Sequence, residues 1–436
     1  MLYKPKVGGA VGHLWSVEPL NLGKLPERFS HPTNCQNREE IVQVQTPPPV
    51  EVRLLPQAPQ AKLTKPSIDR YCIEWVVEME GQGTKQTTPT AHEREIFYVG
   101  GRWIQSAQGG QRFGEQMYVE RLIPTSASAK TADRDPIIFV HGATRSGVDW
   151  LTKPDGSPGW ASYFLAHGFE CYLVDLPFRG RSPWHPDDGE LITFPAASLQ
   201  KLFAAGREYG DWPQAKLHTQ WPGTGAVGDP FFDHFSASTL QMLGDITKQE
   251  SAAQAACAAL LDRIGKPAIV LGHSAGGSTP WLLADVRPKL VRKIIALEPT
   301  GPPFLIKVLK PGPGSRYGIA SVALTYDPPV TDPDVDLVRA EVKGPAEHLL
   351  DCVLQAPSPP PRQLANLKDI PVVVVTAPAS YHAQYDWAIV AYLKQAGVQA
   401  EHVKLQDRGI FGNGHMMFME KNSDEVAAEI MRLIDG

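Results

Sequence analysis

The chain has 436 residues, of which 42% are hydrophobic and 20% are charged, and its formal net charge is -5. This length allows one large domain with insertions or two domains of ordinary size. The charge balance lacks the basic excess that binds nucleic acid or an anionic membrane surface, so we expect a small-molecule partner, no nucleic acid and no membrane.

The first part of the chain differs in composition from the rest. Residues 1–93 are rich in Pro, Gln and Thr and predict an irregular N-terminal arm with one strand at 71–77. From Arg94 the aromatic-rich runs EIFYVGGRWI and QMYVERLI, separated by a glycine-rich stretch, predict an antiparallel hairpin or meander. We therefore divide the chain into an arm, 1–93, and a main domain, 94–436.

After Asp135, short apolar β-branched runs alternate with helical segments. This alternation is typical of a parallel sheet with helices packed on it, and it predicts a doubly wound α/β fold. The predicted strands are 136–140, 170–176, 267–271, 293–299, 370–378 and 401–405, and the clearest helices are 252–264 and 423–434.

Two long intervals, at about 184–250 and 302–365, interrupt the alternation with aromatic, Pro and Gly residues rather than strands. Insertions of this size in a doubly wound domain usually form a lid or cap over the ligand crevice. The aromatic residues of the first interval either line an apolar cavity or form the core of the cap itself. They are Trp184, Phe194, Phe203, Trp212, Trp221, Phe231, Phe232 and Phe235.

The cysteines and the N-terminus bear on location. Five cysteines are scattered without C-x-x-C spacing, which indicates reduced buried thiols and neither a disulfide framework nor a metal site. The N-terminal run MLYKPKVGGAVGHLW lacks the apolar centre of a signal peptide, and no run of eighteen apolar residues occurs in the chain. These features predict a cytoplasmic protein.

The run GHSAG at 272–276 fits G-x-S-x-G and lies between a predicted strand and a helix-like stretch. A serine on a sharp, strained turn needs neighbours without bulky side chains, and such a turn lifts its hydroxyl out of the sheet. The strand-turn-helix setting therefore predicts that Ser274 is a nucleophile.

From Pro136 to the C-terminus the chain resembles the α/β-hydrolase superfamily. The run HGA at 141–143 resembles the oxyanion loop of that family, which implies that the backbone N–H groups of Ala143 and Ala275 hold an oxyanion. The resemblance also predicts lids made by the two insertions, and the fold class is therefore an α/β-hydrolase fold with an N-terminal extension.

The run DLPFRGRS resembles the segment D-x-P-x-x-G-x-S that follows the second parallel strand in many members of the superfamily. We expect a structural role for this segment. Arg179 and Arg181 are predicted to pair with carboxylates.

The position of the triad acid departs from most of the superfamily. The usual Asp would follow strand 370–378, but the run APASYH at that point has no carboxylate. Glu298 ends the run KIIALE, one strand after the nucleophile, and a smaller group of esterases places a Glu there. We prefer Glu298 to Asp386, which lies within the helix after the empty position.

Other runs resemble the same esterase group with a Ser-Glu-His triad. They are YVGGRW, MYVE, GWASYFLAHGFECYLVD, RGRSPW, EPTG and GNGHMMFMEKN. The resemblance allows for a homodimer.

The base is expected last in chain order, on a loop after the final strand, where GNGH ends at His415. His141, His273, His382 and His402 compete poorly, because they lie in the oxyanion loop, in the elbow, or in or beside the preceding segments. The order Ser, Glu, His therefore favours His415.

Together these residues predict a serine hydrolase that cleaves a carboxylic ester or lactone of a small, largely apolar molecule. His415 would accept the proton of Ser274, Glu298 would orient the ring, and an acyl-Ser274 intermediate would form without a metal or organic cofactor. The alternative is a non-hydrolytic enzyme of the same fold that performs acyl transfer, a lyase step or an aldol-type cyclisation in natural-product metabolism.

Overall fold

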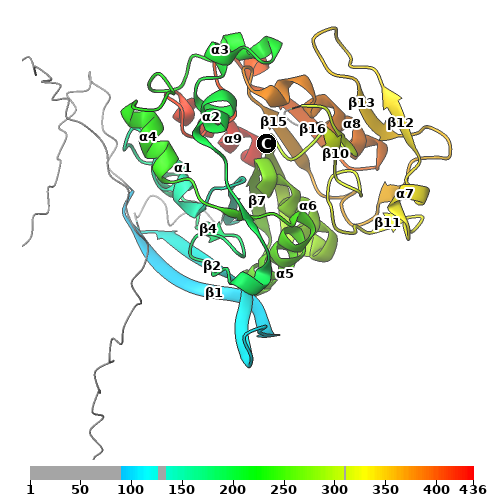
Figure 1. Ribbon diagram of the computed structural model, residues 1–436, viewed down its shortest axis with the longest axis horizontal. Coiled ribbons are helices and arrows are strands. Elements are labelled where there is room, and N and C mark those ends of the chain that lie inside the picture. Colours follow the sequence, from blue (N-terminus) through cyan, green and yellow to red (C-terminus); the bar gives the residue numbers. More distant parts are fainter. Residues whose placement is uncertain (1–89, 126–133, 309–310) are drawn as a thin grey trace, which may run out of the picture. The chain divides into compact units, whose positions relative to one another are not determined.

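The computed structural model describes residues 90–125, 134–308 and 311–436 (Figure 1). The chain divides into two units, Met1–Met79 and Glu80–Gly436, and the described residues all belong to the second. The predicted strand at 71–77 and nearly all of the predicted arm lie outside the described residues.

An eight-stranded sheet forms the centre of the second unit, with the strand order β1-β2-β4-β3-β7-β8-β15-β16. The first two strands form an antiparallel hairpin that pairs antiparallel with β4, and the remaining six strands are mutually parallel. The strands are β1 (His92–Gln105), β2 (Gln111–Pro124), β3 (Ile137–Val140), β4 (Cys171–Asp175), β7 (Ala268–His273), β8 (Val291–Leu297), β15 (Val372–Thr376) and β16 (Ala400–Lys404). The predicted fold class is confirmed.

Burial explains why the parallel strands are continuous apolar runs. Every residue of β3, β4, β7 and β15 is buried, as expected where helices cover both faces of a parallel sheet. The turn between β1 and β2 contains Gly109 and Gly110, with φ values of 94° and 76°, a backbone region that glycine enters without steric cost.

Five helices pack around the sheet, and α5 lies against α6 and the hairpin while α1 lies against α9. They are α1 (Trp160–Ala166), α5 (Ile246–Ile264), α6 (Ser278–Val286), α8 (Asp386–Gln395) and α9 (Ser423–Asp435). Helix α5 begins six residues before its predicted start, because the Asp245 side chain caps it by accepting the Lys248 N–H at 2.9 Å. Gly265, with φ 69°, ends the helix.

The first insertion, which the sequence predicts to be a cap, consists of short elements, drawn in green in Figure 1. Its strands β5 (Leu191–Ile192) and β6 (Met242–Leu243) pair with each other, and its helices are α2 (Ala196–Leu199), α3 (Gly206–Tyr209) and α4 (Pro230–Ala237). Single 3₁₀ turns occur at Gly147–Trp150, Pro186–Asp188, Pro213–Leu217, Ser274–Gly277, Pro288–Leu290, Tyr381–Gln384 and Leu405–Arg408, and a π turn at Gln200–Ala204.

The expectation that the two insertions contain no strands is wrong for both, since β5 and β6 lie in the first and the second is richer in short strands. It holds α7 (Pro333–Asp336) and the short strands β9 (Leu305–Ile306), β10 (Gly312–Pro313), β11 (Tyr326–Asp327), β12 (Arg339–Val342), β13 (Cys352–Gln355) and β14 (Gln363–Leu364). Each strand pairs with another strand of the same insertion. Strands of two to four residues are too short to show a period in the sequence.

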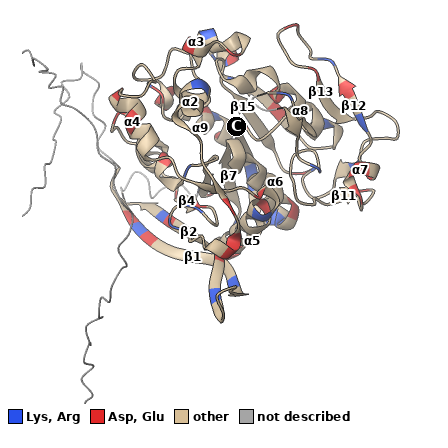
Figure 2. Ribbon diagram, in the orientation of Figure 1, with Lys and Arg blue, Asp and Glu red and all other residues tan. Residues whose placement is uncertain are grey.

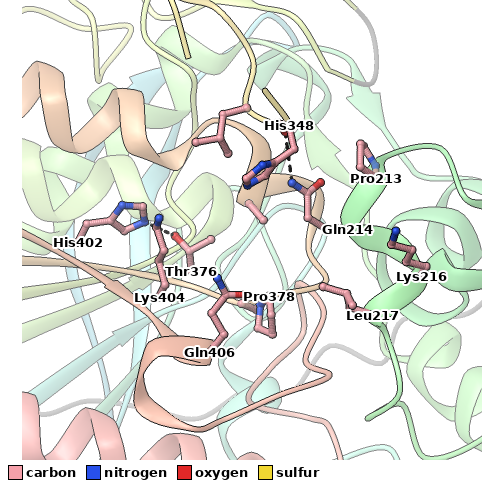
Figure 3. Close-up of a pocket in the computed structure, with 13 residues that line it drawn as sticks. Pro213, Gln214, Lys216, Leu217, His348, Thr376, Pro378, His402, Lys404 and Gln406 are labelled. Atoms are coloured by element: carbon pink, nitrogen blue, oxygen red, sulfur yellow. Dashed lines mark hydrogen bonds between the residues drawn. The ribbon is translucent and has the colours of Figure 1, made fainter. Parts of the chain in front are cut away.

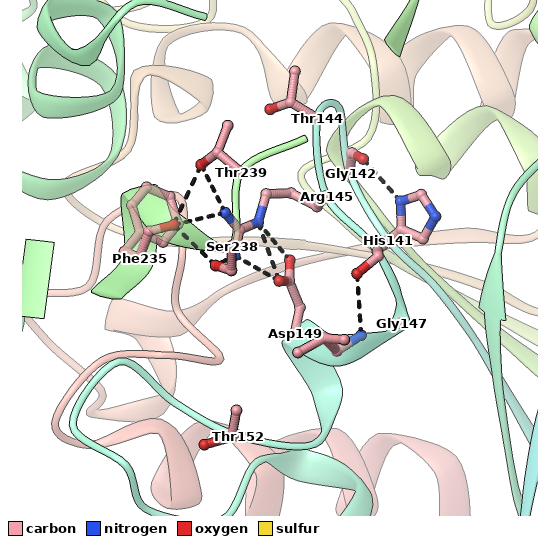
Figure 4. A network of polar contacts seen from close by, with 12 residues as sticks. His141, Gly142, Thr144, Arg145, Gly147, Asp149, Thr152, Phe235, Ser238 and Thr239 are labelled. Atoms are coloured by element: carbon pink, nitrogen blue, oxygen red, sulfur yellow. Dashed lines mark hydrogen bonds and ion pairs between the residues drawn. The ribbon is translucent and has the colours of Figure 1, made fainter. Parts of the chain in front are cut away.

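A buried arginine joins the cap to the sheet (Figure 4). Arg145, in the loop after β3, forms an ion pair with Asp149 at 2.6 Å, and both side chains are at most 3% exposed. Nη1 of Arg145 donates to Phe235 O at 3.2 Å, and Nη2, which also contacts Asp149, donates to Ser238 Oγ at 2.8 Å; both acceptors lie in or next to α4. The guanidinium therefore fixes α4 to the carboxyl edge of the sheet.

Lys and Arg are interspersed with Asp and Glu over the helices and strands of Figure 2. Among the described residues no helix is long and apolar enough to cross a membrane. Cys171, Cys257 and Cys352 are free and buried, as predicted for these three thiols.

Candidate active site

Ser274 lies on a strained turn at the carboxyl end of β7. Its φ of 53° is in the left-handed region that side chains rarely adopt, and α6 begins four residues later. A Cβ at Gly272 would lie 2.8 Å from Gly276 O, and a Cβ at Gly276 would lie 2.2 Å from His141 O. The two glycines of G-x-S-x-G are therefore required by the close approach of the backbone.

Glu298 and His415 meet beside this turn. His415 Nδ1 donates to Glu298 Oε2 at 2.5 Å, and both side chains are at most 1% exposed. Glu298 follows β8 with φ 45°, and it also accepts hydrogen bonds from the Ala377 N–H at 2.8 Å and the Ser380 hydroxyl at 2.6 Å. The carboxylate thus receives three donors in an interior position.

The other ring nitrogen of His415 is buried and has no hydrogen-bond partner among the described residues. The ring lies between Phe203 of the cap, with centroids 5.4 Å apart, and His382, whose parallel ring is 4.7 Å away. Burial lowers the pKa of His415 well below its usual value, and the neighbouring His273 and His382 lower it further. Burial raises the pKa of Glu298, although the donors from Ser380 and Ala377 oppose the shift.

Tyr381 lies beside the histidine. Its ring centroid is 5.0 Å from that of His415. Burial raises the pKa of its phenol well above the usual value. His273, next to the serine in the chain, also lies with its ring 4.4 Å from that of His415. Ser274 and His415 therefore share the same immediate surroundings.

Asp386 belongs to a second buried acid–histidine pair. His382 Nδ1 donates to Asp386 Oδ1 at 3.0 Å, and the Thr376 hydroxyl donates to Asp386 Oδ2 at 2.7 Å. His402 Nε2 lies 2.9 Å from the same hydroxyl, at the wall of a cavity of about 260 Å³ (Figure 3). The carboxylate of Glu298, rather than that of Asp386, thus contacts His415.

Glu298, His382 and His415 each place a potential metal-ligand atom within 4.8 Å of the others. Two of the three residues already use these atoms on each other, since His415 Nδ1 donates to Glu298. His382 Nδ1 is similarly engaged by Asp386. The Nδ1 atoms of both histidines are therefore engaged by carboxylates.

The loop after β3 lies against the nucleophile turn. His141 Nε2 accepts the Leu176 N–H at 3.0 Å, which anchors the start of this loop to the end of β4. A Cβ on Gly142 would lie 3.1 Å from Ser274 Cβ. Ala143 and Ala275 are both half-buried, so their surfaces remain partly open beside the serine.

A cavity of about 410 Å³ adjoins Ala275. Hydroxyl groups line much of it, from Ser278, Thr300 and Ser321 among others, together with apolar residues such as Ile246 and the charged residues Arg179, Glu250 and Arg316. The lining therefore combines polar and apolar surface.

The eight aromatic residues of the first insertion are absent from the described lining of this cavity. Five of them are buried in the hydrophobic core, namely Phe203, Trp212, Trp221, Phe232 and Phe235. For these five the structure shows burial in the hydrophobic core of the domain, and Trp221 also lines a separate cavity of about 710 Å³.

The prediction that Arg179 and Arg181 both pair with carboxylates is only half correct. Arg181 pairs with Asp175 at 2.9 Å and with Glu120 at 2.7 Å. Arg179 forms no ion pair with any described carboxylate, and it donates instead to Gly142 O at 2.8 Å and to Gln249 Oε1 at 2.5 Å. Because Arg179 and Arg181 are only two positions apart, the sequence does not show which of the two guanidinium groups reaches the buried carboxylate of Asp175.

Sequence reasoning missed the side chain that holds the His415 loop. Glu420 accepts the Gly414 N–H at 3.0 Å and the Asn413 amide at 2.9 Å, and it pairs with His218 of the cap at 2.7 Å. Glu420 lies inside the run GNGHMMFMEKN, but its partner is 202 residues away in the sequence. The only available signal was an acidic residue shortly after the predicted base.

Comparison with known proteins identifies the family of the chain. A model of the alpha/beta hydrolase family matches residues 137–429, and the chain belongs to that family. It is 45% identical, over 339 residues, to a protein named "Probable secreted lipase phiG" from Fungal sp. (strain ATCC 74256). That match covers 78% of this chain and 88% of the relative.

A solved structure of a novel bacterial esterase has the same fold, with a TM-score of 0.51 and 24% sequence identity. The match covers 81% of this chain and 98% of that chain. The α/β-hydrolase resemblance inferred from the motifs is thus confirmed for the superfamily.

One expectation from the sequence is corrected by the fungal relative. The composition of the run MLYKPKVGGAVGHLW predicted a cytoplasmic protein, whereas the relative is named as secreted. The composition of the N-terminal run therefore did not indicate the location, and the cytoplasmic assignment is withdrawn.

Proposed function

We propose that this protein hydrolyses carboxylic esters through an acyl intermediate on Ser274. The observation that carries the proposal is the buried pair of His415 and Glu298 beside a serine on a strained turn. Nδ1 of His415 is committed to the carboxylate, which leaves Nε2 as the nitrogen that can accept a proton. The family, and a relative named as a lipase, support ester hydrolysis.

The first step is attack of the Ser274 oxygen on the ester carbonyl carbon while His415 Nε2 takes the hydroxyl proton. A neutral imidazole is needed for this role, and burial keeps the pKa of His415 low. The imidazolium that forms then donates through Nδ1 to Glu298, which stabilises its charge. His415 returns the proton to the departing alcohol, and water releases the acid in a second cycle.

The backbone N–H groups of Ala143 and Ala275 are proposed to bind the oxyanion. Both residues flank the serine on separate loops and remain half-buried. Removal of one such donor typically costs about 3 kcal/mol in transition-state stabilisation. Neither this step nor the proton transfers call on a metal or organic cofactor.

The test is intact-mass analysis after treatment with a fluorophosphonate probe, followed by turnover of p-nitrophenyl esters of graded chain length. We expect one adduct and rapid ester turnover, both absent from a folded Ser274→Ala variant. An adduct without turnover of any ester would favour the non-hydrolytic alternative. No adduct on the folded wild-type protein would overturn the nucleophile assignment.

A further inference from the structure

Arg179 is a buried cation without a described carboxylate partner, in the wall of the cavity that adjoins the nucleophile turn. The residue is only 5% exposed. Burying a charge without a counter-charge is costly, so proteins rarely retain one without a function. Burial lowers the pKa of Arg179 to about 10, which leaves the guanidinium positive at neutral pH.

The hydrogen bonds of Arg179 use only part of its donor capacity. Nη1 donates to Gly142 O and lies 3.4 Å from His141 Nδ1, and Nη2 donates to Gln249 Oε1. Nε has no partner among the described residues. All of these acceptors are neutral, so hydrogen bonding positions the guanidinium but does not neutralise it.

The nearest acidic group is already engaged. Asp175 raises the pKa of Arg179 through space, but its two oxygens accept hydrogen bonds from Arg181 and from the Gly147 N–H. One buried carboxylate thus faces two guanidinium groups, and Arg181 forms the ion pair with it.

The other charged residues of the cavity are also occupied by the protein itself. Glu250 Oε2 accepts the backbone N–H groups of Ser321 at 2.6 Å and Val322 at 3.1 Å, and burial raises its pKa. Arg316 pairs with Asp334 at 2.7 Å at the surface. Arg179 is therefore the lining cation that lacks an opposite charge from the described chain.

We propose that this cavity binds an anionic group of the substrate, a carboxylate, at Arg179. The substrate class is then an ester that carries a free carboxylate on its acyl or alcohol part, with an apolar body against residues such as Ile246. A carboxylate that replaces the missing counter-charge makes charge-assisted hydrogen bonds, which are about twice as strong as neutral ones. This inference rests on the proposed ester hydrolysis and adds the chemistry of its substrate.

The experiment compares kcat/KM for two matched pairs of esters. The acyl pair is p-nitrophenyl hydrogen adipate against p-nitrophenyl adipamate, whose terminal amide has the same size without the charge. The alcohol pair is 4-acetoxybenzoate against 4-acetoxybenzamide. We expect wild-type protein to prefer the acid in at least one pair by about ten- to a hundred-fold.

Three variants assign the preference to Arg179. Arg179→Gln should reduce the preference to near unity, and Arg179→Lys should retain part of it. Gln249→Glu supplies the missing carboxylate at a hydrogen-bond partner of Arg179, so it should remove the preference while leaving the Gly142 contact in place. Arg287→Gln is the matched control, because that arginine pairs with Asp262 at the surface, is absent from the described lining of the cavity, and should leave the preference unchanged.

Two outcomes overturn the inference. One is the absence of any preference for the acid in both pairs with wild-type protein. The other is a preference that survives in Gln249→Glu and in a folded Arg179→Gln protein. Turnover of the neutral amide esters reports the proposed hydrolysis separately, so failure of the carboxylate site and failure of the esterase proposal give different results.

Discussion

Replacement of Glu298 by Gln exchanges one carboxylate oxygen for an amide that donates hydrogen bonds. Three donors now face the carboxylate, from the Ala377 N–H, the Ser380 hydroxyl and His415 Nδ1. The hydroxyl can rotate to accept, but the backbone N–H cannot. The amide oxygen of the introduced glutamine must therefore remain on Ala377, and its NH₂ group must face the imidazole.

That orientation forces His415 to move its proton to Nε2, because Nδ1 must now accept. A ring with its hydrogen on Nε2 cannot take the proton of Ser274. In serine proteases the equivalent loss of tautomer control lowers kcat by about ten-thousand-fold, which corresponds to about 5.5 kcal/mol. We expect a loss of about a thousand- to ten-thousand-fold for Glu298→Gln, with little change in the free energy of unfolding.

The opposite orientation would leave the buried N–H of Ala377 against the NH₂ group and cost about 1–3 kcal/mol of stability. Urea denaturation beside steady-state kinetics on a p-nitrophenyl ester therefore distinguishes the two orientations. Asp386→Asn is the matched control, because an amide there can still accept from His382 while the Thr376 hydroxyl turns. A loss below about ten-fold is expected, since ten-fold equals about 1.4 kcal/mol, roughly one net hydrogen bond.

The acid assignment would be refuted by near-normal kcat in Glu298→Gln together with a large loss in Asp386→Asn. Both carboxyl groups are buried, so either substitution can also destabilise the fold. The kcat values of the two variants should therefore be compared together with their free energies of unfolding. Each variant should also be checked for its fluorophosphonate adduct, which reports whether the nucleophile remains reachable.

Three further predictions follow from the described contacts. Arg145→Met should lower the free energy of unfolding in urea by about 3–5 kcal/mol, because it leaves Asp149 charged and buried; a loss below about 1 kcal/mol would contradict a structural ion pair. Glu420→Gln should lower kcat by about ten-fold or more, because it weakens the hydrogen bonds that position the loop of His415. An unchanged kcat would show that this loop keeps its position without the Glu420 carboxylate. Burial lowers the pKa of His415, so the ring becomes protonated only at a pH below the usual value of about 6.5. The acid limb of kcat/KM should therefore have its midpoint below about 6.5. A midpoint above that value would contradict the lowered pKa.

The sequence predicts much of the sheet because the signals involved are local. Continuous β-branched runs mark β3, β7 and β15, since strands covered on both faces tolerate few polar residues. The turn at Ser274 is also local, because steric crowding within five residues demands its glycines. The order of serine, acid and histidine along the chain then follows from the strand order of the fold.

The weaker predictions concern elements without a strong period. The second insertion was expected to lack strands, yet RAEV at 339–342 pairs with CVLQ at 352–355. Four residues with mixed polarity carry too little alternation to predict a strand. The absence of an apolar N-terminal run misled the assignment of location, which is a matter of processing signals rather than of folding physics.

Only the tertiary structure decides which polar side chains meet. Arg179 and Arg181 are two residues apart with the same chemistry, but the strands around Asp175 give the ion pair to Arg181 and leave Arg179 at the cavity. Likewise, His415 contacts Glu298 across 117 positions and Glu420 reaches His218 across 202. The local sequence determines where the backbone turns and which faces are buried, whereas the counter-charge of a buried group depends on distances between strands that no local pattern encodes.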